Sequence, residues 1–176
     1  MLLKILDELK LPPLLPREEM LEILQEEIYG YMPPKPESIS FEVEEEVIPK
    51  FCAGKAVCNK VTAKCIVNGK EFSFPFFANL PTDNEKHPFF IHVNFRDLNP
   101  DRYMPTEEII DNGFAVFSVY YNDITSDDGD FTNGFAGILF PDGKRSSTSP
   151  GKIAMWAWAA SRVMDYAQTL TDRLLV

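Results

Sequence analysis

The stretch 149–166 constrains the fold most, because it predicts one long and largely buried helix. A Pro-Gly pair marks its start, and no further glycine or proline interrupts it. Trp158 and Ala159 widen its apolar face, which favours burial on more than one side. The main stripe follows steps of three and four residues: Ile153, Trp156, Ala157, Ala160, Val163, Met164 and Ala167.

Three charged residues interrupt this helix: Lys152, Arg162 and Asp165. Arg162 and Asp165 are three positions apart, so we expect them to pair on the helix surface.

The composition suits one soluble domain. The 176 residues are 45% apolar and 25% charged, and fourteen phenylalanines favour a core that contains strands. The net charge of −10 argues against nucleic acid and against an anionic membrane surface as partners. No apolar run approaches the about 18 residues of a membrane span.

The cellular compartment is predicted from the amino terminus and the cysteines. Lys4, Asp7 and Glu8 interrupt the first apolar residues, which is unlike a secretory signal. The cysteines are odd in number and lack metal-ligand spacing: Cys52, Cys58 and Cys65. Reduced thiols in a cytoplasmic protein are the simplest interpretation.

Alternating strands dominate the range 35–80. Apolar and polar residues alternate over 41–47, 57–67 and 72–76, which predicts antiparallel strands with one polar face. Asn68-Gly69 predicts a tight hairpin, because both residues accept a positive φ. Pro75 places the third strand at an edge or a bulge.

The pattern changes in the range 81–176. Residues 88–94 and 114–120 are nearly all apolar, as in parallel strands buried on both faces. A short helix is predicted between them, with Thr106 as its N-cap and Gly113 as its end. Strand, helix and strand make a right-handed βαβ crossover.

The range 1–34 predicts a helical amino-terminal segment. Residues 1–16 form a weak helical start that is ended by prolines. A second helix is predicted from Arg17 to Tyr29, with a stripe of Leu21, Leu24 and Ile28.

Two motifs carry a family resemblance. The sequence Trp-Ala-Trp-Ala-Ala-Ser-Arg-Val-Met-Asp-Tyr at 156–166 resembles the helix before the nucleophile strand in α/β-hydrolases of carbohydrate esterase family 15. Arg17, Met20 and the run Tyr-Gly-Tyr-Met-Pro-Pro at 29–34 resemble the first segment of the same enzymes. This group contains glucuronoyl esterases and relatives called acetyl xylan esterases.

The resemblance implies a single partial domain over 1–176. The expected fold is α/β, the amino-terminal half of an α/β-hydrolase sheet, with antiparallel strands that lead into a parallel βαβ unit and flanking helices. Residues 171–176 would lead into the nucleophile strand. The serine of the family's Gly-x-Ser-Arg-x-Gly-Lys turn has no match in this sequence.

No catalytic residue is predicted in this chain. Ser161 lies in mid-helix between Ala160 and Arg162, where no nucleophile turn can form. His87 and His92 both precede the position at which the catalytic histidine of such hydrolases occurs. The loop after the strand 88–94 can supply oxyanion donors in this fold, which makes Phe95 the one weak site prediction.

An acidic loop spans 122–131, with four aspartates. One specific hypothesis is a calcium loop of the EF-hand type that starts at Asp123. That loop requires glycine at its sixth position and glutamate at its twelfth, whereas this chain has Asp128 and Gly134 there. A solvated loop at the end of a strand is favoured. We predict no metal and no cofactor.

The functional prediction is the amino-terminal part of a serine carbohydrate esterase, which lacks the nucleophile and is inactive alone. The alternative is a stand-alone, non-catalytic binding or interaction module. Expected partners are a carbohydrate ester, a second copy of the chain, or a missing carboxyl-terminal half, because a parallel sheet that stops early leaves an unpaired edge.

Overall fold

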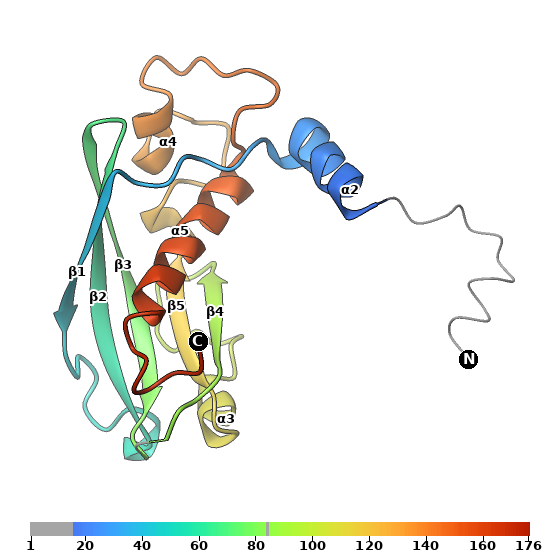
Figure 1. Cartoon of the computed structure of the whole chain (residues 1–176). Coiled ribbons are helices and arrows are strands. Elements are labelled where there is room, and N and C mark those ends of the chain that lie inside the picture. The colour runs from blue at the N-terminus through green and yellow to red at the C-terminus, as the bar shows by residue number, and fades with distance from the viewer. Residues whose placement is uncertain (1–15, 84) are drawn as a thin grey trace, which may run out of the picture.

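A computed structural model describes residues 16–83 and 85–176 as one mixed sheet with helices against it. The strand order is β1-β2-β3-β5-β4 (Figure 1). The weak helical start predicted for 1–16 lies almost wholly outside the described residues. The elements are α2 Arg17–Leu24, η1 Gln25–Tyr29, β1 Ser38–Glu44, η2 Phe51–Gly54, β2 Ala56–Val67, β3 Lys70–Pro81, β4 Phe89–Asn94, α3 Thr106–Asp111, β5 Ala115–Tyr120, η3 Tyr121–Asp123, α4 Gly134–Leu139 and α5 Lys152–Ala167.

The first three strands form the predicted antiparallel meander. β1 pairs with β2, and β2 pairs with β3 over its whole length. Asn68 and Gly69 connect β2 and β3 with φ values of 52° and 68°, the positive values that the hairpin prediction required. The alternating pattern therefore identified these strands, although β1 begins and ends three residues earlier than predicted.

The prediction that Pro75 puts its strand at an edge needs correction. β3 lies inside the sheet, between β2 and β5. It pairs with β5 only over 77–79, so the β5 side of the strand is still open at Pro75. A residue without a backbone N–H is tolerated there, because β3 pairs on one side only at that point.

The parallel half is confirmed. β4 and β5 pair in parallel from Phe89 with Ala115 to Asn94 with Tyr120, and α3 connects them. The predicted N-cap is wrong: α3 begins at Thr106 itself, Pro105 occupies the capping position, and the Thr106 hydroxyl donates to the Met104 carbonyl over 3.4 Å. The predicted end is right, since Gly113 has a φ of 79° and its N–H bonds to Ile110.

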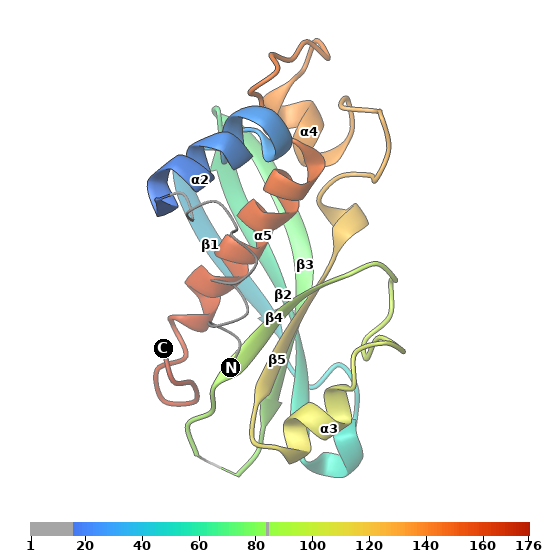
Figure 2. The same ribbon diagram turned by 90° about the vertical axis from the view of Figure 1, so that its right-hand side faces the viewer.

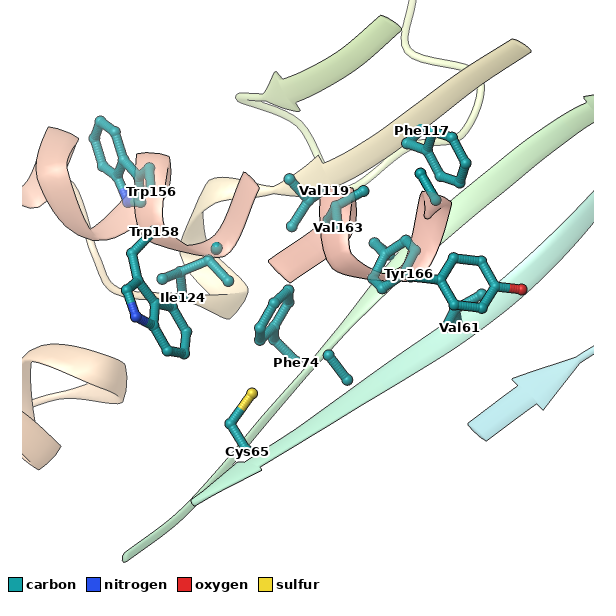
Figure 3. Packing of buried hydrophobic residues seen from close by; sticks show 14 of the residues in the cluster. Val61, Cys65, Phe74, Phe117, Val119, Ile124, Trp156, Trp158, Val163 and Tyr166 are labelled. Carbon is teal, nitrogen blue, oxygen red and sulfur yellow. The ribbon is translucent and has the colours of Figure 1, made fainter. Parts of the chain in front are cut away.

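α5 packs along one face of the sheet, and its buried side chains join those of the strands in the main core (Figures 1 and 2). The Trp158 ring stacks on Phe135 with centroids 4.1 Å apart and also meets Phe74. Tyr166 contacts Phe76 and Phe117 at the other end of the helix (Figure 3). Aromatic side chains from strands and helix thus interlock over the whole interface.

The buried face of α5 differs from the predicted stripe. Ile153 and Ala157 are exposed, whereas Lys152 and Arg162 are buried. Arg162 Nε donates to Asp165 over 2.6 Å, so the predicted pair exists. It is not a surface pair, however, because the Arg162 guanidinium is buried and lies over the Trp158 ring. The chain segments that cover the helix, described below, account for this rotation.

The helices α2 and η1 lie on the outside of the main core (Figure 1). α2 continues into the π-helix η1, and no residue of either is buried. The predicted stripe therefore remains on the surface, with Ile28 63% exposed. After η1 the chain returns to the body: Tyr31 N–H bonds to Thr148, and Gly151 N–H bonds to Tyr29.

Gly30 makes this return possible. It has a φ of 75°, and a Cβ atom there would lie 2.0 Å from the Ser149 carbonyl oxygen. Only glycine permits both the backbone conformation and the close approach.

The last described residues begin to pair beside β4. Leu174 forms a parallel bridge with His87, supported by hydrogen bonds from His87 N–H to Arg173 and from Leu175 N–H to His87. The range 171–176, predicted to lead into a further strand, thus reaches the outer side of β4. None of the described helices is long and apolar enough to cross a membrane.

Candidate functional site

The candidate site lies where β4 and β5 end. Because parallel strands open at the same edge of a sheet, ligands of open α/β sheets bind beyond their carboxyl ends. The loop 95–104 follows β4, and the loop 121–133 follows β5. The amino end of α5 and the helix η1 complete this edge.

An aromatic cluster joins the two loops to α5. The rings of Phe95 and Tyr121 stack with centroids 4.7 Å apart and planes at 19°. Trp156 meets both rings edge-on, at 5.4 Å from each. Trp156 Nε1 also donates to the Thr125 carbonyl over 3.2 Å, which orients the indole. The aromatic cluster is therefore a fixed surface.

A groove of about 460 Å³ runs beside the aromatic cluster. Phe95 is 55% exposed there, and Ile153 contributes a second exposed apolar side chain. The groove is lined by side chains from η1, both loops and α5: Ile28, Tyr29, Phe95, Asp127, Ile153 and Trp156. Its chemistry suits an apolar or flat ligand surface with one acidic contact at Asp127.

Lys152 holds the acidic loop in place from the first turn of α5. Its Nζ donates to Thr125 Oγ1 over 3.0 Å and to the Asp130 carbonyl, and it lies 3.9 Å from Asp128. Burial lowers the pKa of Lys152, although Asp128 and Asp130 oppose this. The loop thus receives an internal cation from the protein.

The remaining acidic contacts of this loop are local. Asp130 accepts bonds from Thr132 and Asn133, and these hydrogen bonds lower its pKa to about 2. Within the part of the chain that is described, no three His, Cys, Asp or Glu side chains are grouped to hold a metal ion.

The two histidines have different surroundings, and neither belongs to the aromatic cluster. His87, before β4, contacts the Gly113 carbonyl through Nδ1 at 2.9 Å and Asp83 through Nε2 at 2.7 Å. His92, within β4, has Nε2 at 3.6 Å from Asp101, and this nitrogen forms no hydrogen bond. Neither histidine is hydrogen-bonded to a serine or cysteine.

The serines and cysteines have structural surroundings. Ser161 donates to the Ala157 carbonyl one turn earlier, as a mid-helix serine does. Cys58 and Cys65 are buried, and burial raises the pKa of each thiol to about 11. Cys52 is partly exposed, and its pKa is raised by burial and by Glu107 and Asp111. None of these thiols is activated as a nucleophile.

Sequence reasoning named Phe95 as an oxyanion-loop candidate, a role that stays a prediction, and it missed most of the residues around Phe95 in the aromatic cluster. Tyr121, Thr125 and Lys152 are distant in sequence from Phe95 and belong to no motif. A lysine at the start of an otherwise apolar helix is the one sequence signal that could have indicated a buried cation with a partner, and the sequence analysis did not use it.

Known proteins with this fold were identified by structure. No family sequence profile matches the chain, and no curated protein matches it. A family 15 glucuronoyl esterase from Teredinibacter turnerae has a TM-score of 0.71 at 22% identity. The match covers 90% of this chain and 44% of the esterase chain. A glucuronoyl esterase from Solibacter usitatus has a TM-score of 0.71 at 24% identity. This match covers 90% of this chain and 50% of the esterase chain.

A third structure, from Bacteroides fragilis and described as an acetyl xylan esterase, has a TM-score of 0.52 at 12% identity and covers 90% of this chain and 44% of its own. The chain thus spans half the length of these proteins or less. This chain has the fold of the amino-terminal portion of the α/β-hydrolases of carbohydrate esterase family 15.

Proposed function

We propose that this chain is the amino-terminal part of a serine carbohydrate esterase of the glucuronoyl or acetyl xylan type, and that it is inactive by itself. The match over 90% of the chain to solved glucuronoyl esterases carries the proposal. The loops 95–104 and 121–133, which follow β4 and β5, would then border the cleft for a carbohydrate ester. Serine acylation needs a nucleophile bonded to a base, and neither histidine of the chain provides one.

The first test is hydrolysis of an aryl acetate and of a methyl glucuronate ester by the purified chain. We expect the rate of the buffer alone, because no serine here has a histidine as its base. A rate that survives further purification and that disappears in a serine-to-alanine variant would overturn the inactivity proposal. Reading the gene beyond codon 176 is the complementary test, with a Gly-x-Ser-Arg-x-Gly-Lys turn as the expected result.

The exposed groove supports a second candidate, a binding module without chemistry. Phe95 and Ile153 present apolar surface at an edge where open sheets bind ligands. Saturable binding of a glycan or a protein that is weakened by Phe95→Ala, with no turnover, would favour this candidate.

A cytoplasmic location remains part of the proposal. Its support is that all three cysteines are free thiols. Cell fractionation with a tagged chain tests it, and recovery from an extracytoplasmic fraction would contradict it.

A further inference from the structure

β1 is an open edge of the sheet. Among the described strands it pairs with β2 only, and it is the outermost strand on its side (Figure 1). The last described residues pair at the opposite side of the sheet, where Leu174 bridges to His87 beside β4. A strand that is added beside β4 would therefore leave the β1 edge unpaired. The backbone groups of an open edge can pair with another strand, so β1 is a candidate interface.

The sequence of β1 is nearly self-complementary. It covers the seven residues Ser38–Glu44, which read Ser-Ile-Ser-Phe-Glu-Val-Glu, and Phe41 stands at the centre. Ile39 and Phe41 pack against the main core, so the serines and glutamates point to the opposite face of the sheet. On that face, the half before Phe41 carries only hydroxyls, and the half after it carries only carboxylates.

A second copy of β1 fits this strand in antiparallel orientation. When a two-fold axis passes through Phe41, all seven residues have a partner, and the two copies use the same surface. On the core face, Ile39 lies opposite Val43 of the second copy, and Phe41 lies opposite Phe41. Val43 is 45% exposed in the single chain, so this pairing would cover it. Aromatic and β-branched pairs of this kind are favourable across antiparallel strands.

On the polar face, each carboxylate lies opposite a hydroxyl. Ser40 faces Glu42 of the second copy, and Ser38 faces Glu44. A serine O–H can donate to a carboxylate oxygen, so these cross-strand pairs attract each other.

The neighbouring strand supports this pairing. Lys64 of β2 forms an ion pair with Glu42, and Lys60 lies opposite Glu44 in the register of β1 with β2. The Glu42 side chain is 68% exposed, so it remains accessible to a second copy. Both carboxylates therefore meet the second copy with a lysine beside them, which reduces the repulsion between two chains of net charge −10 each.

Other registers are less favourable. An axis one residue later, at Glu42, would place that carboxylate against its own copy, and an axis one residue earlier would place Glu44 beyond the end of the second strand. With the axis at the centre of β1, the next pair outside the strand would set Glu45 against Glu37. These like charges limit the pairing to the strand itself.

We propose that two copies of this chain pair through their β1 edges, antiparallel and centred on Phe41, to form one continuous sheet. Seven residues on each side are fewer than the about 20–30 of a standard interface, so we expect a weak dimer that depends on concentration. This interface goes beyond the proposed function and does not depend on ester cleavage.

The first test is sedimentation velocity over a range of concentrations, with a Phe90→Lys background that blocks the β4 edge. We expect a reversible equilibrium between one chain and two. Ser40→Glu sets two pairs of carboxylates against each other and should raise the dissociation constant about tenfold. Ser73→Glu is the matched control, because Ser40 and Ser73 flank Lys64 on the same face and only Ser40 lies at the edge. The control should leave the dissociation constant unchanged.

Disulfide formation tests the register. One chain carries Ser40→Cys and the other Glu42→Cys, both with Cys52→Ser, because Cys52 is the cysteine that is only partly buried. Residues opposite each other in antiparallel strands have Cα atoms about 4.5–5.5 Å apart, within the reach of a disulfide. We expect this pair to cross-link on oxidation. Ser40→Cys with Glu44→Cys, the pair of a shifted register, should cross-link far less.

Three results would each overturn the proposal. They are a single chain at every concentration, an effect of Ser73→Glu equal to that of Ser40→Glu, and equal cross-linking of the two cysteine pairs. Circular dichroism checks that each variant folds, and the cysteine pairs decide the register if Ser40→Glu does not fold.

Discussion

At the residue scale, His87 is the clearest titrating group. Its Nδ1 must donate to the Gly113 carbonyl, and its Nε2 faces the Asp83 carboxylate, so both nitrogens favour carrying a proton. Burial opposes the charged form, but the bonds to Asp83 and Gly113 outweigh it and raise the pKa of His87. The bond to His87 in turn lowers the pKa of Asp83.

The sign of the pH dependence follows from these directions. A raised His87 pKa contributes stability that is complete below the unfolded value of about 6.5 and is lost as the pH rises through the folded value. The lowered Asp83 pKa contributes stability above about 3.9 that is lost on acidification. We therefore expect a larger free energy of unfolding near pH 6 than near pH 8.5, measured by urea denaturation.

Asp83→Asn is the control for this pH dependence. It removes the carboxylate but keeps a side chain of the same size, so the difference between the two pH values should shrink. An unchanged difference in this variant would show that other groups cause it.

At the scale of the element, α5 depends on contacts that span the chain. Trp158 Nε1 donates to the Pro34 carbonyl over 2.7 Å, 124 positions away in sequence, which fastens the amino-terminal segment to the core. Lys152 and Trp156 hold the loop after β5 against the first turns of the same helix. α5 therefore joins the segments before and after the sheet.

Trp158→Phe tests this connection. The substitution keeps an aromatic ring but leaves the Pro34 carbonyl without its donor, so we expect a loss of about 1–3 kcal/mol in the free energy of unfolding. Ile153→Ala, at an exposed position on the same helix, should stay within about 0.5 kcal/mol. Urea denaturation followed by circular dichroism measures both, and a Trp158→Phe value as small as the control would contradict the expectation.

At the scale of the whole molecule, two more surfaces are available for association. Among the described strands, β4 pairs with β5 on one side only, and Phe90 is exposed on it. α2 and η1 carry a second apolar surface: Met20, Leu21, Ile23, Leu24 and Ile28. Open sheet edges and exposed apolar patches both recruit partners.

We propose that the chain associates with itself or with a carboxyl-terminal half through the β4 edge. Light scattering after size exclusion should give a mass above that of one chain. Phe90→Lys should reduce it, because a charge on an edge strand blocks pairing. Ile23→Lys separates the two surfaces, because a mass reduced only by this variant would assign the contact to α2. A monomer at all dilutions would contradict self-association, and the carboxyl-terminal half is tested by adding it as a separate chain.

The sequence by itself determined the strands and the long helix α5, whereas η2, η3 and α4 were not predicted. Alternation over 57–67 and the Asn68-Gly69 turn defined the hairpin. The two strands of a hairpin are adjacent in sequence, and the positive φ values of the turn depend on the two turn residues themselves, so local sequence is sufficient. The unbroken apolar stretch defined α5 in the same way, and the Trp-rich motif indicated the hydrolase fold.

The tertiary structure alone decided which faces are buried and where the sites lie. The buried face of α5 is rotated from the predicted stripe because Pro34, Thr125 and Asp130 reach it from distant parts of the chain. The short pairing of β3 with β5 tolerates Pro75 inside the sheet. Periodicity reports the contacts of a residue with its own element, whereas these features arise from contacts between elements that no local pattern records.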